Sequence, residues 1–355
     1  MLRNIFDCQY IPTLGFKPAE FRAVAELPNF DKDEIFPHFL LAPWVSSYTL
    51  EKGVEKILST YPDRPFFLGV DRYYRPQDVE KPAQAQFLRI LEDNDGRRNY
   101  FEFIAQFENA IPAIELCGVS AVSLQHQIER AILLGRGVLL TITDNTAGID
   151  NGVWDALAES EFGDPAFLID FGWFPDPLLQ EAIYTQYTHE IFRIFDRAAV
   201  IISSASFPRE FSNFEGVVSI PIGNRSLFNS VSARFNQEKI IYGDWGSTKP
   251  RAYQGGGKPI ARIDYALRDR WVVSRNKDDE WGYEEAAENL VSSAEWDPAI
   301  NVWGTNLIEQ TALSMPFSIS SSIAVVSARI NIHLHRQARY QPPAIGMSTD
   351  EPWED

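Results

Sequence analysis

The chain has 355 residues, 45% of them hydrophobic and 23% charged, which suits one large barrel or about two domains of average size. Its 49 acidic side chains outnumber 32 basic ones, and the net charge of −17 argues against bulk binding of nucleic acid or of an anionic membrane surface. Two cysteines cannot form a disulfide framework, and no apolar run reaches the roughly 18 residues of a membrane span, so we expect a cytoplasmic protein without a membrane partner.

Short apolar runs alternate with segments of helical period along most of the chain. The runs cover residues 10–14, 35–41, 65–70, 110–116, 137–142, 166–171, 198–202 and 239–242. The helical segments between them cover residues 18–27, 50–61, 83–91, 120–134 and 177–195. This alternation is typical of βα units, and the span is that of a closed (β/α)8 barrel, roughly 250 residues. An open doubly wound sheet is the alternative, but no GxGxxG turn follows the first run. We therefore predict an α/β fold, a TIM-barrel-like (β/α)8 barrel whose first and last strands pair.

The C-terminal third predicts an elaboration of the same domain. Residues 261–276 alternate apolar and polar positions and indicate a β-hairpin, and residues 283–296 and 321–339 indicate helices, the last of which could close the barrel. The predicted organisation is a barrel core in residues 1–250, a hairpin and helix elaboration in 251–345, and an acidic tail in 346–355.

Several sequence blocks resemble one known family in the same order along the chain. They are YIPTLGFKPAEFRAVAEL at residues 10–27, LIDFGW at 168–173, SSASFP at 203–208, YGDWGSTKP at 242–250, ARIDYALRDRWVVSRN at 261–276 and NIHLHR at 331–336. Together they resemble the phage beta protein family, most specifically in the SFP and GDWGS blocks. The resemblance implies a barrel-like protein of phages and bacterial mobile elements with a role in phage-host conflict. It implies no particular reaction.

Four carboxylates stand at or near predicted strand ends, where a (β/α)8 barrel builds its active site. They are Asp71, Glu115, Asp170 and Asp244, and Lys17 follows the first strand. Converging carboxylates could hold a divalent cation such as Mg²⁺ or act as a general acid and base, and we expect Asp170 and Asp244 to share one pocket. The alternative is structural, because Asp after a strand commonly caps a helix, and Asp71 or Glu115 could pair with an arginine.

Positive charge is concentrated in residues 249–277, directly after the last predicted strand. Barrels often bind phosphate with the loops after strands seven and eight, so Lys249, Arg251 and Lys258, which follows three glycines, are candidates for anion binding. Ser206 after strand seven is a further candidate, or it shapes a tight strand exit. The alternative for the whole segment is a solvated glycine loop, and its aromatic residues are explained by base stacking or by a half-buried strand pair.

The histidines predict no metal centre. His333 and His335 are two residues apart, so on a helix they point to different faces, and His38 in the second strand is expected to be a hydrogen-bonded core residue.

Two functions fit these observations. The first is a hydrolase acting on a phosphate-containing substrate, with the four carboxylates as metal ligands or acid and base groups and with Lys17, Arg251 or Lys258 as charge stabilisers. The second is a non-catalytic binding protein in anti-phage defence, such as a phage sensor, an immunity protein or a toxin partner, that contacts another defence or phage protein.

Overall fold

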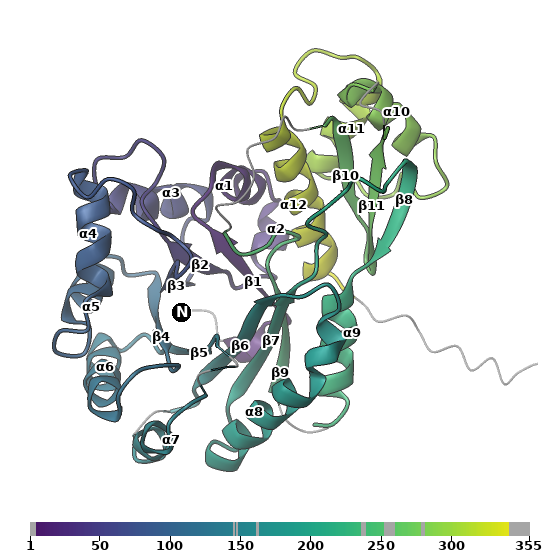
Figure 1. The fold of residues 1–355 in the computed structure, drawn as a ribbon. Helices are drawn as coiled ribbons and strands as arrows, with labels where there is room; N and C mark the ends of the chain where they lie inside the picture. Colours follow the sequence, from purple (N-terminus) through teal and green to yellow (C-terminus); the bar gives the residue numbers. More distant parts are fainter. Residues whose placement is uncertain are drawn as a thin grey trace, which may run out of the picture.

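The computed structural model describes residues 5–144, 146, 148–160, 163–235, 239–251, 260–277 and 281–340. Within them, eight parallel strands close into a barrel with helices around it (Figure 1). The barrel strands are β1 (Tyr10–Gly15), β2 (His38–Leu41), β3 (Phe66–Val70), β4 (Ala110–Glu115), β5 (Leu139–Ile142), β6 (Ala166–Trp173), β7 (Ala199–Ala205) and β9 (Lys239–Asp244). Tyr10 lies opposite Tyr242 in the pairing of β1 with β9. The predicted fold class and the predicted closure are confirmed.

The helices outside the barrel include those predicted over residues 18–27, 50–61, 83–91, 120–134, 177–195 and 321–339, and four short ones that the sequence does not predict. They are α1 (Pro18–Ala25), α2 (Asn29–Lys32), α3 (Glu51–Thr60), α4 (Pro82–Leu91), α5 (Arg98–Ala105), α6 (Ala121–Leu134), α7 (Asn151–Ala158), α8 (Glu181–Ile194), α9 (Gly223–Ser232) and α12 (Ser322–Ala338), with short 3-10 turns η1 (Ile5–Asp7) and η2 (Pro177–Gln180). The boundaries have local causes: Ser120 accepts a hydrogen bond from the Ser123 amide at the start of α6, and Gly135 ends that helix at φ 65°. No helix of the described residues is long and apolar enough to cross a membrane.

Side chains alternate along each barrel strand between the barrel interior and the helix layer. Apolar side chains fill the interior near the strand starts and include Ile11, Phe36, Phe67, Ile111, Leu139, Ile201 and Ile241. The residues between them, such as Tyr10 in β1 and Phe167 in β6, pack outward under the helices. The interior is therefore plugged at the end where the strands begin, which leaves the other end for a site.

A second, three-stranded antiparallel sheet stands beside the barrel, in the order β10 (Arg262–Ala266), β11 (Arg270–Arg275) and β8 (Gly216–Pro221). The predicted hairpin over 261–276 is its β10 and β11. The third strand, β8, is contributed from between the last two barrel strands, so the elaboration begins before residue 251. Tyr265 and Trp271 are fully buried in the core of this part, together with α10 (Tyr283–Val291) and α11 (Trp303–Ala312), so these two rings are not available for base stacking.

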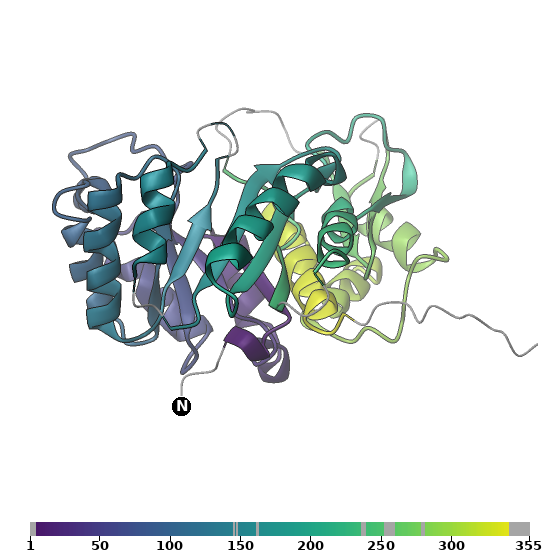
Figure 2. The same ribbon diagram turned by 90° about the horizontal axis from the view of Figure 1, so that it is seen from below.

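Helix α12 joins the two parts of the molecule. It packs against α1 and β1 of the barrel on one side and against α11 and β10 on the other. Figure 2 shows it lying between the barrel strands and the second sheet. The last predicted helix therefore returns to the barrel.

Candidate functional site

A cavity of about 500 Å³ opens at the ends of the barrel strands. Glu115 from β4 and Asp170 from β6 both line it, together with Arg72, which follows β3. Two of the four predicted carboxylates thus face one cavity.

The two cavity carboxylates have different surroundings. Glu115 accepts hydrogen bonds from the Cys117 amide at 3.1 Å, from Thr141 Oγ1 at 3.3 Å and from Thr143 Oγ1. Asp170 is 3% exposed and accepts one from the Gly172 amide at 2.8 Å. Burial raises the pKa of Asp170, against the opposing positive charge of nearby Arg72. Asp170 therefore holds a proton more readily than an ordinary aspartate.

Arg72 is a fixed cation between these groups, which the sequence analysis did not select. Its guanidinium donates to the Thr143 carbonyl at 2.6 Å and to the Tyr73 hydroxyl at 2.7 Å. Burial on its own would lower the pKa of Arg72, but Tyr73, Asp170 and Glu115 raise it above its ordinary value. The lining also includes Asp93, Asp144 and Arg97, so the cavity combines four carboxylates with two permanently charged arginines.

Asp71 lies outside the cavity, although it adjoins Arg72 in the chain. Its carboxylate accepts a hydrogen bond from Arg251 Nε at 2.9 Å and another from the Tyr73 amide at 3.0 Å. Asp71 is only 3% exposed, so this ion pair fixes the segment that carries Arg251 against the end of β3. This is the arginine pairing considered as the structural alternative.

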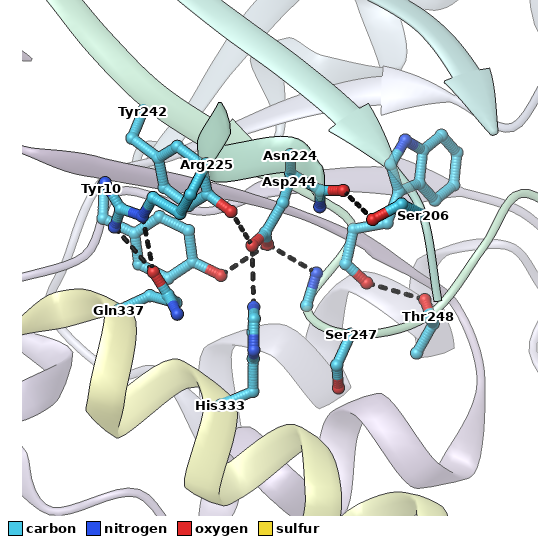
Figure 3. Close-up of polar contacts among 12 residues, drawn as sticks. Tyr10, Ser206, Asn224, Arg225, Tyr242, Asp244, Ser247, Thr248, His333 and Gln337 are labelled. Carbon is cyan, nitrogen blue, oxygen red and sulfur yellow. Dashed lines mark hydrogen bonds and ion pairs between the residues drawn. The ribbon is translucent and has the colours of Figure 1, made fainter. Parts of the chain in front are cut away.

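Asp244 does not line the cavity, so the expectation that it shares a pocket with Asp170 is wrong. It is fully buried and points outward from the barrel under α12 (Figure 3). Its carboxylate accepts hydrogen bonds from the hydroxyls of Tyr10 at 2.6 Å and Tyr242 at 2.8 Å and from the Gly246 amide at 2.8 Å, and lies 2.7 Å from His333 Nε2. The physical reason is strand alternation, because Asp244 lies on the same side of β9 as the outward-facing Tyr242.

The four carboxylates therefore do not form the predicted Mg²⁺ site. The described residues contain no group of three or more His, Cys, Asp or Glu side chains that could hold a metal ion. As expected, His333 and His335 point apart, toward Asp244 and Asp31 respectively. His38 differs from its prediction, because it is buried without a hydrogen-bond partner among the described residues and lines the cavity.

A second hollow, a cleft of about 590 Å³, lies between the barrel and the second sheet. Lys17, Lys249 and Arg251 line it, so the structure brings three predicted residues together. Lys258 lies outside the described residues. Ser206 does not line the cleft, since its hydroxyl is buried and donates to Asn224 Oδ1 (Figure 3), so its expected role in anion binding lacks a geometric basis.

Three arginines that the sequence analysis did not select complete the basic lining of the cleft: Arg209, Arg262 and Arg329. Three carboxylates pair with members of this set: Glu20 with Lys17, Asp71 with Arg251, and Asp264 with both Arg262 and Arg329. Six cations and three carboxylates leave three positive charges in excess.

Lys249 and Arg209 have no carboxylate partner among the described residues. Arg209 stacks its guanidinium on the Trp173 ring at 3.8 Å from the centroid. Burial and the positive charges of Arg209, Arg262 and Arg329 lower the pKa of Lys249. An anion in the cleft would relieve this repulsion.

The cavity and the cleft share the segment that follows β9. Trp245 lines the cavity, whereas Thr248, Lys249 and Arg251 line the cleft. The Thr248 amide donates to the Trp245 carbonyl at 2.8 Å, which makes a tight turn between the two surfaces. The cavity and the cleft are therefore built in part by neighbouring residues of one segment.

A family model described as Beta protein matches residues 10–339. The chain belongs to the Beta protein family. Protein beta of Enterobacteria phage P4 is 24% identical to it over 343 residues, which cover 92% of this chain and 92% of the phage protein. The Beta protein family thus includes a phage protein of almost the same extent.

In this Beta protein family member, the blocks that carry the resemblance meet around Asp244. Asp244 belongs to GDWGS and His333 to NIHLHR, and Ser206 of SFP lies close by (Figure 3). Because Asp244 also accepts from the Gly246 amide, this buried network holds the start of the segment shared by cavity and cleft.

Signals for the missed residues differ in strength. Arg72 directly follows the third strand, and Arg209 lies in the loop after the seventh, so strand position alone could have selected both. Arg329 lies inside α12 and reaches the cleft only because that helix packs beside β10.

Proposed function

We propose that this chain is a hydrolase that acts on a phosphate-containing substrate and works in phage-host conflict. The observation that carries the proposal is the pair of cavity carboxylates, Glu115 and Asp170, around Arg72 beside a cleft with excess positive charge. The cleft provides the electrostatic attraction for a phosphate group, and the cavity provides acid and base groups.

Asp170, Glu115 and Arg72 each have a role in this reaction. Asp170, whose pKa burial raises, donates a proton to the leaving group. Glu115 accepts a proton from the attacking water, and Arg72 stabilises the negative charge that develops in the transition state. Lys249 and Arg209 bind the substrate phosphate in the cleft.

The biological setting rests on the phage relative. Protein beta is a protein of phage P4, and from this phage source we infer a role in phage-host conflict, such as anti-phage defence. The two free cysteines suit a cytoplasmic site of action.

Hydrolysis of a panel of phosphate-containing substrates by the wild type, Asp170→Asn and Glu115→Gln tests the proposal, with cleavage followed at bonds away from the phosphate, because the acid and base groups lie in the cavity and the phosphate lies in the cleft. We expect each substitution to reduce kcat by about 100-fold or more, because a positioned acid or base contributes roughly that factor. Glu108→Gln is the matched control, since Glu108 is exposed at the opposite end of β4, and it should retain full activity. Full activity in Glu115→Gln, or no hydrolysis by the wild type, would contradict the proposal.

One observation favours the second candidate, a non-catalytic binding protein. Leu313, Met315 and Phe317 are 71%, 46% and 94% exposed on one loop, which suits contact with another protein. This alternative predicts that the purified product of a neighbouring gene binds the wild type in a titration and binds a Leu313→Ser, Phe317→Ser variant more weakly. Equal affinity for the two would contradict it.

A further inference from the structure

The floor of the barrel cavity holds two buried polar side chains that lack a hydrogen-bond partner in the described part of the chain. Thr13 in β1 and His38 in β2 are register partners on adjacent strands, and they are 1% and 4% exposed. Thr13 Oγ1 and both ring nitrogens of His38 have no hydrogen-bond partner among the described residues. Both residues line the cavity. Because buried polar groups are nearly always hydrogen-bonded in native proteins, these three atoms indicate a missing ligand.

The barrel makes room for this arrangement with small residues. A Cβ on Gly69 would lie 2.4 Å from His38 Nε2 and 3.5 Å from Ala113 Cβ. A larger residue at position 69 would displace the imidazole, so glycine keeps the ring in the cavity. Burial lowers the pKa of His38 to about 3, and the ring therefore offers one donor and one acceptor without charge.

The cavity walls add acceptors and aromatic surface. Glu115 and Asp170 supply carboxylate oxygens, and Trp245 meets Tyr73 edge to face at 6.1 Å between ring centroids. Hydroxyl groups donate and accept, so a ring bearing several of them suits a neutral floor and acidic walls, and its apolar face suits an aromatic side chain. The volume lies within the range of small-molecule sites, about 300–1,000 Å³.

We propose that the cavity binds the sugar ring of a sugar phosphate, with ring hydroxyls on Thr13 and His38 and the phosphate in the adjacent cleft. The carboxylates of the cavity repel a phosphate, whereas the cleft attracts one through Lys249 and Arg209. The inference rests on the proposed function for the place of the phosphate, and it adds the chemical class of the remaining part of the substrate. The sugar could belong to a free sugar phosphate or to a nucleotide.

Calorimetric titration of the full chain with ribose 5-phosphate, adenosine 5′-monophosphate, ribose and inorganic phosphate tests this inference. We expect ribose 5-phosphate to bind at least 10-fold more tightly than ribose or inorganic phosphate. Tighter binding of the nucleotide than of ribose 5-phosphate would identify nucleotides as the source of the sugar, and equal or weaker binding would identify free sugar phosphates. Equal affinities for ribose 5-phosphate and inorganic phosphate, or no binding of either phosphorylated ligand, would overturn the inference.

Thr13→Val removes one hydroxyl at constant shape. It should weaken the binding of ribose 5-phosphate at least 5-fold and leave the affinity for inorganic phosphate unchanged. Thr185→Val is the matched control, because Thr185 Oγ1 is also buried without a partner but lies on α8 outside the cavity. His38→Gln, which retains a neutral donor and acceptor, should weaken the sugar less than His38→Leu. Wild-type affinity in both Thr13→Val and His38→Leu would overturn the inference. Because the readout is binding, sugar recognition without turnover would contradict only the proposed hydrolase.

Discussion

Replacing Asp244 by alanine should destabilise the protein strongly. Asp244 is fully buried, and its carboxylate is surrounded by His333, two tyrosine hydroxyls and the Gly246 amide. Removing the buried carboxylate leaves the hydroxyls of Tyr10 and Tyr242 and the Gly246 amide without their acceptor, and each orphaned buried donor costs about 1–3 kcal/mol. We therefore expect Asp244→Ala to lower the free energy of unfolding by about 3–5 kcal/mol, and Asp244→Asn, which keeps an acceptor oxygen, to lower it less.

Urea unfolding at pH 7, followed by tryptophan fluorescence, measures this loss, and Asp196→Ala at an exposed loop position is the control, expected to behave as wild type. The pH dependence gives a second check. Burial would raise the pKa of Asp244, but the charge of His333 and the hydrogen bonds hold it below its ordinary value. A carboxylate whose pKa is lowered by folding stabilises the fold at pH values above its pKa in the unfolded chain, about 3.9. The difference in free energy of unfolding between wild type and Asp244→Ala should therefore narrow as the pH falls below about 3.9. A loss under about 1 kcal/mol for Asp244→Ala at pH 7 would refute this reasoning.

Three further predictions concern stability. Gly304→Ala places a Cβ 2.5 Å from the Ala328 carbonyl of the facing helix and should cost about 1–3 kcal/mol in urea unfolding. Tyr100→Phe removes a hydroxyl that bonds the Ala113 carbonyl at 2.9 Å and its amide at 2.8 Å, and should cost about 1–3 kcal/mol in the same assay. Burial lowers the pKa of His38 to about 3, so His38 stays neutral in the folded protein but is protonated in the unfolded chain below about pH 6.5. Between pH 6.5 and 3, the free energy of unfolding of the wild type should therefore fall by up to about 1.4 kcal/mol per pH unit relative to that of His38→Gln.

The barrel could be predicted from sequence because its strands are buried on both faces and therefore form continuous apolar runs, as in Phe66–Val70. Strand β8 could not, because its side chains are largely half-exposed and its partner β11 follows much later in the chain, with Gly216 opposite Arg275. The short helices α2, α5, α7, α9 and α11 were not predicted either. Each spans three turns or fewer, too few for a distinct periodic pattern.

Position at a strand end located the candidate site, but the side of the strand on which a residue lies decided whether it lines the cavity. Leu168 and Asp170 share one side of β6, which faces the interior, whereas Asp244 shares its side of β9 with Tyr242, which faces the helices. The sequence shows which residues of a strand share one side. It does not show which side faces the barrel interior, because that depends on how the neighbouring strands pair with it. The side chain that faces the cavity here is that of Trp245, the residue that directly follows β9.

The cleft was partly predictable for the same kind of reason. Lys249 and Arg251 follow the last strand of the barrel, and this position alone selects them. The contribution of Arg329 depends on the packing of α12 between the barrel and the second sheet, which no local pattern encodes.

Soaking crystals of the chain with tungstate, a heavy analogue of phosphate, tests most directly whether the cleft is the phosphate site of the molecule. We expect an anomalous peak in the cleft within hydrogen-bonding distance of Lys249 and Arg209, and loss of that peak in a Lys249→Ala, Arg209→Ala variant. Tungstate bound inside the cavity beside Glu115 and Asp170, or bound elsewhere with the cleft empty, would contradict this expectation.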